Sequence, residues 1–327
     1  MTLAASPAAE AAQSAVVVMY HRFNEPEHPT TNIRLDQFEQ HLAELTSGKY
    51  TVLPLSKIVA ALKAGERLPE HTVGISIDDA FASAYTFAWP RLKKAGLPFT
   101  LFVSTGPVDG KLNGIMTWDQ IRELKAGGVE IGHHTVSHGH MADASLQLNQ
   151  REVDDAKERF KAEIGSVPAL FAYPYGEASA DIQAMLRDKG FTAAFGQHSG
   201  VAHASLGFFY LPRFALNENF GGINRFKLAV NAMAIDVTDI TPVDPLVGAA
   251  NPPAMGFTVK PPAPGGIGRL TCFASNQGPT QVESLGDVRF EIRVSKPFLP
   301  GRTRINCTLP GPDGRWYWLG RQFYLRK

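Results

Sequence analysis

Short runs of apolar residues alternate with amphipathic stretches over the first two-thirds of the chain. Each run has the length of a buried strand, and the stretches between the runs place apolar side chains at helical spacing. Strands that alternate with helices in this way predict a parallel sheet with helical crossovers. The predicted strands are Val16–Tyr20, Tyr50–Leu53, Val73–Ile77, Phe99–Val103, Val129–Gly132, Ala169–Tyr173, Thr192–Phe195 and Phe208–Leu211.

Three of the amphipathic stretches predict individual helices. They are Leu35–Leu45, Trp118–Lys125 with Thr117 as its N-cap, and Leu148–Ile164. Seven or eight strand–helix units fit between residues 15 and 241. We therefore expect an α/β fold, a deformed and closed or nearly closed (β/α)7–8 barrel, with an open doubly wound sheet as the alternative.

The amino-acid composition of the chain changes after residue 241. Residues 242–268 are rich in proline and glycine and predict a linker or extended edge segments rather than a helix. Residues 269–327 predict a small all-β, sandwich-like domain, and residues 1–14 predict a flexible leader. The strands expected in the β domain are Leu270–Ala274, Val288–Val294, Arg304–Leu309 and Trp316–Leu325.

Composition and charge exclude some classes of partner. Hydrophobic residues make up 44% and charged residues 19% of the chain, as in ordinary globular proteins, and the formal net charge is +1. This balance gives no reason to expect nucleic acid as a partner. No run approaches the roughly 20 apolar residues that a membrane-spanning helix needs. The oligomeric state does not follow from these features.

The chain has two cysteines, Cys272 and Cys307, and both lie in alternating, strand-like stretches. Such cysteines can bridge neighbouring strands, which would indicate an oxidising compartment. This favours a periplasmic or secreted protein. Two buried free thiols in a cytoplasmic protein are the alternative.

Polar side chains follow five of the predicted strands. The carboxyl ends of the strands form the active-site face of parallel barrels, so these five groups are expected to meet at one mouth. The groups are Tyr20-His21-Arg22, Asp78-Asp79, the segment from His133 to His138, Tyr173-Pro174-Tyr175-Gly176 and Pro212-Arg213.

His134 and His138 are four residues apart, a spacing that lets two imidazoles face one ion. Two imidazoles and one carboxylate suit zinc or a similar transition metal. His133 and His140 crowd the same segment, so spacing alone does not decide which histidines bind, and a His-rich surface loop is the alternative. For Asp78-Asp79, the alternative is an N-cap beside a solvated neighbour.

The order of these motifs resembles the NodB-homology polysaccharide deacetylases, carbohydrate esterase family 4. The resemblance covers about residues 15–215, and its flanking motifs are similar to the branch that de-N-acetylates poly-β-1,6-N-acetylglucosamine. It rests on Ser76-Ile77-Asp78-Asp79, His134-Thr135-Val136-Ser137-His138, the segment from Phe171 to Glu177, the segment from Met19 to Phe23, and Leu211-Pro212-Arg213.

The resemblance implies a role for each motif residue. One divalent metal ion is expected, with Zn²⁺ first and Co²⁺ or Ni²⁺ as alternatives. Two positions depart from the family pattern, because Ala80 replaces the usual glycine and Ala172-Tyr173 replaces an arginine. The implied roles are Asp79, His134 and His138 as metal ligands, Asp78 as general base, His21 as general acid, Tyr175 at the oxyanion hole, Arg213 as a positive charge beside Asp78, and Phe23, Tyr173 and Pro174 as substrate-binding residues.

The implied function is metal-dependent hydrolysis of N-acetyl groups from N-acetylglucosamine units of an extracellular or cell-envelope polymer, such as a biofilm polysaccharide. Two alternatives stay open: a related metal amidohydrolase that acts on a small cyclic amide, and a catalytically silent sugar-binding protein. Trp316 and Trp318 would share one face of the last strand, where they would form core more readily than a sugar site.

Overall fold

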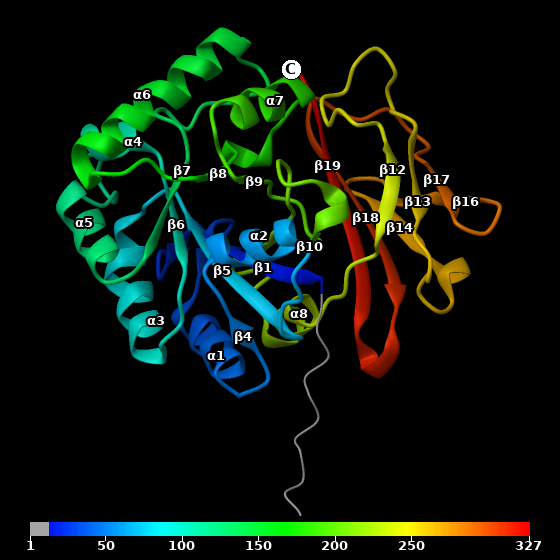
Figure 1. Cartoon of the computed structure of the whole chain (residues 1–327), viewed down its shortest axis with the longest axis horizontal. Helices are drawn as coiled ribbons and strands as arrows, with labels where there is room; N and C mark the ends of the chain where they lie inside the picture. The colour runs from blue at the N-terminus through cyan, green and yellow to red at the C-terminus, as the bar shows by residue number, and fades with distance from the viewer. Residues whose placement is uncertain (1–12) are drawn as a thin grey trace, which may run out of the picture.

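The computed structural model describes residues 13–327, and most of the first two-thirds of the chain forms one parallel sheet with helices around it (Figure 1). The sheet order is β10-β1-β5-β6-β7-β8-β9, with β4 beside β5 and β11 beside β1. Residues 1–12 of the expected leader lie outside the described residues. The strands are β1 (Ser14–Tyr20), β4 (Thr51–Val52), β5 (Thr72–Asp78), β6 (Thr100–Val103), β7 (Glu130–His133), β8 (Leu170–Ala172), β9 (Ala193–Phe195), β10 (Val201–His203) and β11 (Phe214–Ala215), while β2 (Arg22–Phe23) pairs with β3 (Asn32–Ile33) separately.

The strands from β1 through β5, β6, β7 and β8 to β9 pair in parallel, and only β10 is antiparallel to its neighbour. The connecting helices cover the outer side of this curved sheet (Figure 1). The prediction of a deformed parallel barrel is therefore confirmed. The helices are α1 (Leu35–Leu45), α2 (Leu55–Ala64), α3 (Trp89–Ala95), α4 (Thr105–Asp109), α5 (Trp118–Ala126), α6 (Leu146–Ile164), α7 (Ala180–Asp188) and α8 (Ile223–Val230).

Residues 211–215 close the gap between the last and first parallel strands. Leu211 forms a parallel bridge with Phe195 of β9, and β11 pairs in parallel with β1 a few residues later. The predicted strand Phe208–Leu211 is therefore reduced to a single bridge at its end. This crossing places Arg213 between the two edges of the sheet.

Helix caps explain where two predicted helices begin. The Thr117 hydroxyl accepts a hydrogen bond from the Gln120 backbone N–H at 3.3 Å, which confirms Thr117 as the N-cap of α5. Helix α6 begins two residues earlier than predicted, because Ser145 caps it by accepting from the Leu148 N–H at 3.2 Å. The apolar stripe missed this first turn because Leu146 is exposed and does not belong to the buried face of the helix.

The last part of the chain, which we call the β unit, consists of two four-stranded antiparallel sheets that enclose an apolar core (Figure 1). Their orders are β12-β13-β17-β16 and β15-β14-β18-β19. The alternating residues Met255, Phe257 and Val259 are buried, so β13 lies inside a sheet although a linker was expected there. The division of the chain into domains stays a prediction. The strands are β12 (Val237–Thr241), β13 (Met255–Val259), β14 (Thr271–Ala274), β15 (Gly278–Pro279), β16 (Gln281–Leu285), β17 (Arg289–Arg293), β18 (Gly301–Pro310) and β19 (Trp316–Leu325).

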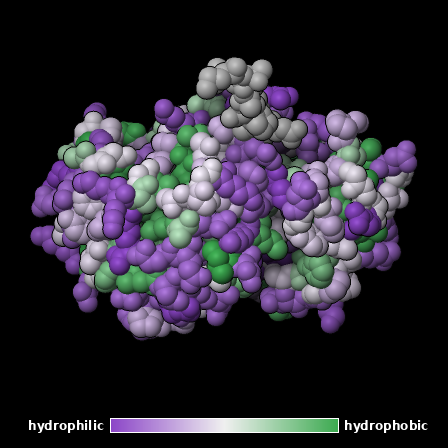
Figure 2. All heavy atoms as spheres, turned by 90° about the horizontal axis from the view of Figure 1, so that it is seen from below, coloured by the Kyte–Doolittle hydropathy of each residue, from purple (hydrophilic) through white to green (hydrophobic). Residues whose placement is uncertain are grey.

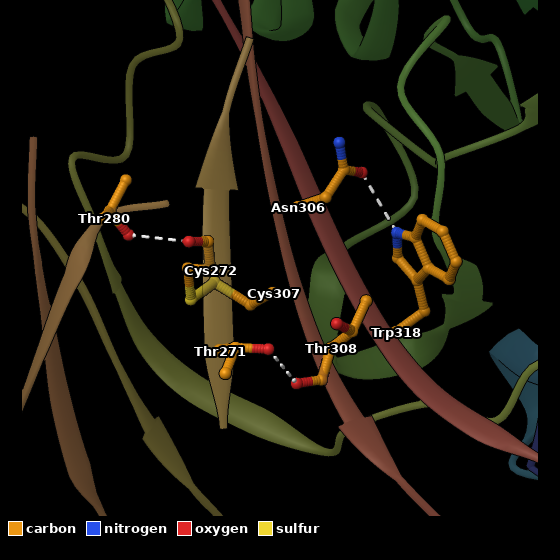
Figure 3. The surroundings of a disulfide bond; sticks show 7 residues. All are labelled: Thr271, Cys272, Thr280, Asn306, Cys307, Thr308 and Trp318. Carbon is orange, nitrogen blue, oxygen red and sulfur yellow. Dashed lines mark hydrogen bonds between the residues drawn. A yellow bond between two sulfur atoms is a disulfide. The ribbon is translucent and has the colours of Figure 1, made fainter. Parts of the chain in front are cut away.

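A disulfide joins two strands of the β unit (Figure 3). Cys272 of β14 and Cys307 of β18 are direct partners in the antiparallel ladder, and both are buried in the core of the β unit. The Thr280 hydroxyl donates to the Cys272 carbonyl at 3.1 Å and fixes the edge strand beside this pair. The strand β18 is thus held to β14 both covalently and through the ladder.

The β unit packs closely against the loops at the mouth of the barrel, with β18 and β19 on the side that faces it (Figure 1). The Gln322 side-chain amide donates to the carbonyls of Tyr175 and Gly176 at 3.2 and 2.7 Å. A Cβ atom built on Gly320 would lie only 1.7 Å from the Ser199 carbonyl oxygen. Glycine is therefore required where β19 meets the barrel.

We expect Gly320→Ala to loosen this contact and lower the free energy of unfolding by about 1–3 kcal/mol, the usual cost of overpacking. The two backbones would have to separate, because neither the added methyl group nor a carbonyl oxygen can rotate away. Chemical denaturation should measure the loss. Gly268→Ala is the matched control in the same β unit, since nothing lies within 4 Å of its added Cβ. Equal stability of the two variants would contradict the close contact.

The surface gives two further facts about the described residues. None of their helices is both long and apolar enough to cross a bilayer. The face seen in Figure 2 is largely hydrophilic, with hydrophobic residues scattered over it in small groups.

Candidate active site

Three side chains that suit a metal ion converge at the carboxyl ends of the parallel strands. Asp79 follows β5, and His134 and His138 follow β7. The Asp79 Oδ1 atom lies 3.2 Å from Nε2 of each histidine. One ligand atom from each residue lies within 4.8 Å of the other two, so all three can reach one ion.

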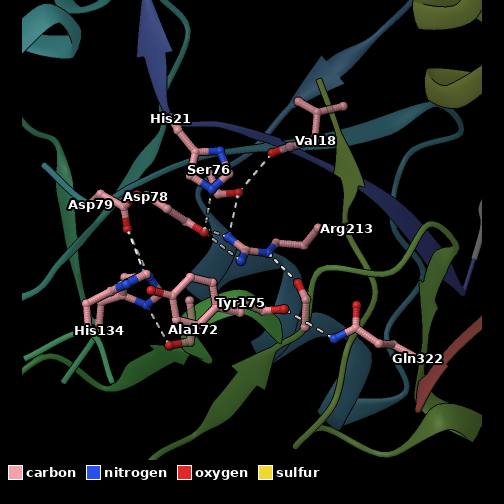
Figure 4. Close-up of polar contacts among 12 residues, drawn as sticks. Val18, His21, Ser76, Asp78, Asp79, His134, Ala172, Tyr175, Arg213 and Gln322 are labelled. Atoms are coloured by element: carbon pink, nitrogen blue, oxygen red, sulfur yellow. Dashed lines mark hydrogen bonds and ion pairs between the residues drawn. The ribbon is translucent and has the colours of Figure 1, made fainter. Parts of the chain in front are cut away.

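The hydrogen bonds of His134 show that this cluster suits a cation. Its Nδ1 lies 2.7 Å from the Ala172 carbonyl oxygen, which can only accept, so Nδ1 carries a proton and leaves Nε2 as the nitrogen that can bind a metal ion (Figure 4). The Nε2 lone pair then points at the Asp79 carboxylate, which is also an acceptor. Both atoms are buried and have no hydrogen-bond partner among the described residues. Two opposed acceptors in a buried place are stabilised by a cation between them.

The structure also distinguishes the four neighbouring histidines. The His133 ring is buried on the other side of β7, where Nδ1 accepts from the Thr135 N–H at 3.1 Å and Nε2 donates to the Val153 carbonyl at 3.2 Å. Burial lowers the pKa of His133 to about 3, so this ring is neutral. His140 is hydrogen-bonded to Glu177, with Nδ1 and Oε2 2.8 Å apart. Of the four, only His134 and His138 face Asp79.

Asp78 is held apart from this cluster by Arg213. The two Arg213 Nη atoms donate to the two carboxylate oxygens of Asp78 at 2.7 and 2.8 Å, and both side chains are fully buried (Figure 4). Burial by itself would raise the pKa of Asp78, but the Arg213 guanidinium, together with His134 and His21, more than offsets this and holds that pKa below its ordinary value. Ser76 and the Gly196 carbonyl bind the same guanidinium. Asp78 is therefore an ionised carboxylate in a fixed orientation.

His21 and Tyr175 complete the group at the barrel mouth. The His21 Nε2 atom lies 3.9 Å from Asp78 Oδ2 (Figure 4). The Tyr175 ring lies 4.6 Å from the His138 ring and stacks on His140 at 4.2 Å. His21, Asp79, His138 and Tyr175 all line one cavity of about 580 Å³.

Several residues of the site have left-handed backbone conformations that side chains rarely adopt. Asp79 and Ala80 have φ angles of 76° and 55°, and His138 and Tyr175 have φ angles of 56° and 58°. Ala80 thus adopts, without glycine, the turn for which the family pattern uses glycine. Strained backbone of this kind is typical of functional sites, where the surrounding structure enforces it.

Three predicted substrate-binding residues are not placed to contact a substrate. Phe23 and Tyr173 are completely buried in two apolar cores, and the Tyr173 hydroxyl donates to the Phe209 carbonyl at 2.7 Å. Pro174 is buried too, and none of the three lines the cavity. We therefore correct this part of the prediction, since these side chains support the site by packing.

The sequence patterns did not predict that the β unit supplies one wall of the cavity. A polar residue at every second position of β18 is the pattern that could have indicated it, because these positions alternate with the buried core of the β unit. The wall residues are Arg302, Arg304, Asn306 and Trp318, and the barrel adds Thr30, Thr31, Gln197, Ser199, Asn217, Phe220 and Arg225.

Comparison with known proteins places this geometry in a family. Residues 65–194, which include Asp78, Asp79, His134 and His138, match the model of the polysaccharide deacetylase family. The chain contains a polysaccharide deacetylase domain. This confirms the resemblance found in the motifs, and with it the prediction of a hydrolytic enzyme of the polysaccharide N-deacetylase class.

Relatives and solved structures agree with this family. The chain is 25% identical over 201 residues to the poly-β-1,6-N-acetyl-D-glucosamine N-deacetylase of Staphylococcus aureus (strain MRSA252), covering 58% of this chain and 69% of the relative. It is 24% identical over 219 residues to the enzyme of the same name in Escherichia coli (strain K12), covering 53% of this chain but only 32% of that longer relative. The structure of IcaB from Ammonifex degensii superposes with a TM-score of 0.58 at 26% identity, covering 65% of this chain and 95% of the other.

Proposed function

We propose that the deacetylase hydrolyses the N-acetyl groups of N-acetylglucosamine units in a polysaccharide, with one divalent metal ion held by Asp79, His134 and His138. The observation that supports the proposal is the cluster of Asp79, His134 and His138, in which the buried acceptors of Asp79 and His134 face each other at a distance that suits a bound cation. Two imidazoles and one carboxylate favour Zn²⁺, with Co²⁺ and Ni²⁺ as alternatives.

A bound divalent ion would supply Lewis acidity, which activates water and polarises the acetamide carbonyl. The residues of the chain would supply the proton transfers. Asp78 takes the proton of the attacking water, since its carboxylate is ionised and is not one of the three clustered ligands. His21, beside Asp78, gives a proton to the departing sugar amine. The Tyr175 backbone N–H would hold the oxygen that becomes negative.

Arg213 would act as a positioning residue rather than a catalytic one. Its two-point contact fixes the plane of the Asp78 carboxylate, and its charge keeps that carboxylate ionised. Because both carboxylate oxygens face the guanidinium, Asp78 stays out of the metal cluster. The adjacent carboxylates of Asp78 and Asp79 can thus perform different tasks.

Acetate release from defined substrates tests this proposal. The panel contains chitooligomers, β-1,6-linked N-acetylglucosamine oligomers and cyclic imides, each with and without a chelator. We expect acetate from the acetylated oligomers, loss of that activity with the chelator, and recovery on adding Zn²⁺. Turnover of the cyclic imides alone would favour the small-amide hydrolase, and tight sugar binding without turnover would favour a silent binding protein.

We also propose a periplasmic or secreted location. The buried disulfide between Cys272 and Cys307 supports it, because such bonds persist mainly in oxidising compartments. Fractionation of cells that produce the deacetylase, followed by thiol labelling of the unfolded chain, tests this point. Recovery of two reduced cysteines in the cytoplasmic fraction would contradict it.

A further inference from the structure

We propose that the active-site cavity binds an anionic group of the saccharide through Arg225, Arg302 and Arg304, so that the preferred substrate is an acidic, N-acetylated polysaccharide. This inference rests on the proposed deacetylase function and specifies its class of substrate. It depends on the wall that the β unit adds to the barrel.

Two elements from different parts of the chain present these arginines. Arg302 and Arg304 lie two residues apart on β18, so they share the strand face that is opposite the buried core of the β unit. Arg225 comes from helix α8 of the barrel part. All three line the same cavity as the candidate metal ligands Asp79 and His138.

Few carboxylates within the described residues balance the positive charge of these three arginines. Neither Arg225 nor Arg304 forms a salt bridge there, and Asp79 is the only carboxylate that lines the cavity. Arg302 is 3.8 Å from the Glu177 carboxylate, which His140 also binds. If the metal takes Asp79, as proposed above, the cavity keeps three guanidinium groups that no carboxylate of its lining can neutralise.

The individual contacts of Arg225 and Arg304 leave donors free for a ligand. Arg304 donates through Nε to the Gln197 carbonyl at 3.2 Å. The Arg225 guanidinium lies 5.3 Å from the Phe214 and Trp318 rings, and its buried Nη1 has no hydrogen-bond partner among the described residues. Burial lowers the pKa of both arginines. A buried charge without a partner is costly, and a bound anion would remove that cost.

The position of the arginines fits a group on the substrate rather than a separate ligand. The Arg302 guanidinium lies 5.6 Å from the Tyr175 ring, which itself packs against His138. An anion held there would belong to the reacting sugar or to its neighbour along the polymer. Phe220, which is 55% exposed, also lines the cavity and offers an apolar surface to a sugar ring. Guanidinium groups bind carboxylate and sulfate in the same two-point geometry, so both substituents are candidates.

Isothermal titration of the zinc-loaded full chain with two matched pairs of probes tests the inference. The first pair is a hyaluronan hexasaccharide and its carboxyl-reduced form, and the second is O-sulfated chitohexaose and chitohexaose. We expect at least one anionic probe to bind about tenfold more tightly than its neutral partner. Preference within the first pair assigns a carboxylate, and preference within the second assigns a sulfate. Equal affinity within both pairs would overturn the inference.

The variant Arg225→Gln/Arg304→Gln should lose this preference, so that the anionic and the neutral probe of each pair bind with equal affinity. Arg269→Gln, an exposed arginine of the β unit, is the control and should keep the preference. The opposite outcome is a double variant that loses thermal stability and retains the preference. The arginines would then only stabilise the contact between the β unit and the barrel, and the inference would be wrong. The proposed function is assessed separately by acetate release. Absence of acetate from every probe would refute deacetylation, while the affinities would still report on charge.

Discussion

Asp79→Ala should remove the metal ion and reduce acetate release by at least about a thousandfold. The substitution deletes the carboxylate that faces both His134 and His138, and two imidazoles alone hold a divalent ion weakly. A metal ion contributes several kcal/mol of transition-state stabilisation, and each 1.4 kcal/mol corresponds to a factor of ten in rate. Mass spectrometry of the dialysed protein measures the zinc content, and the acetate assay measures the rate.

The chain offers a matched control for this experiment. Glu25, Glu27 and His28 form a second group of side chains close enough to share an ion, but two of the three are exposed. His28→Ala should therefore leave the zinc content at one ion per chain. If His28→Ala removed the zinc and Asp79→Ala did not, the assignment of the metal centre would be wrong.

Asp78→Asn should keep the metal ion but lower kcat by about a hundredfold to ten-thousandfold, the range of general base catalysis. The amide cannot take a proton from water, yet it has nearly the same shape as the carboxylate. Zinc content should stay unchanged because Asp78 is not among the three clustered ligands. A kcat within a few fold of the wild-type value would exclude Asp78 as the base.

The thermal stability of the Asp78→Asn variant must be measured on the same samples as its kcat. Asp78→Asn leaves the buried Arg213 without its counter-charge, which costs about 3–5 kcal/mol when one partner of a buried pair is removed. Thermal unfolding will show whether the variant is folded at the assay temperature. Asp188→Asn, at an exposed position in α7, should change neither stability nor kcat.

The sequence predicted those parts of the fold that a local pattern encodes. The parallel strands β1, β5, β6, β8 and β9 contain runs of apolar residues, and the capping residue Thr117 defines the start of α5. The order of the motifs also predicted that Asp79, His134 and His138 lie close together, because strand ends meet at one face of a barrel. Arg213 was expected beside Asp78, and the structure places it there.

Other features depend on packing between distant segments, and no local pattern encodes them. Phe23 and Tyr173 were expected at the surface of the site, but aromatic side chains next to a motif look the same in sequence whether they face substrate or core. The wall formed by β18 was missed because its first residue, Arg302, lies 89 positions after Arg213, where the last motif ends. The strand β16 was missed because most of its residues are polar and exposed.

Buried and cavity-facing residues alternate strictly along β18, so substitutions that affect the core of the β unit and substitutions that affect the cavity fall at different positions. Residues such as Thr303, Ile305 and Cys307 point into the β unit, while Arg302 and Arg304 point into the cavity. Substitutions at the cavity-facing positions can therefore alter which polymer is accepted without disturbing the fold that presents them.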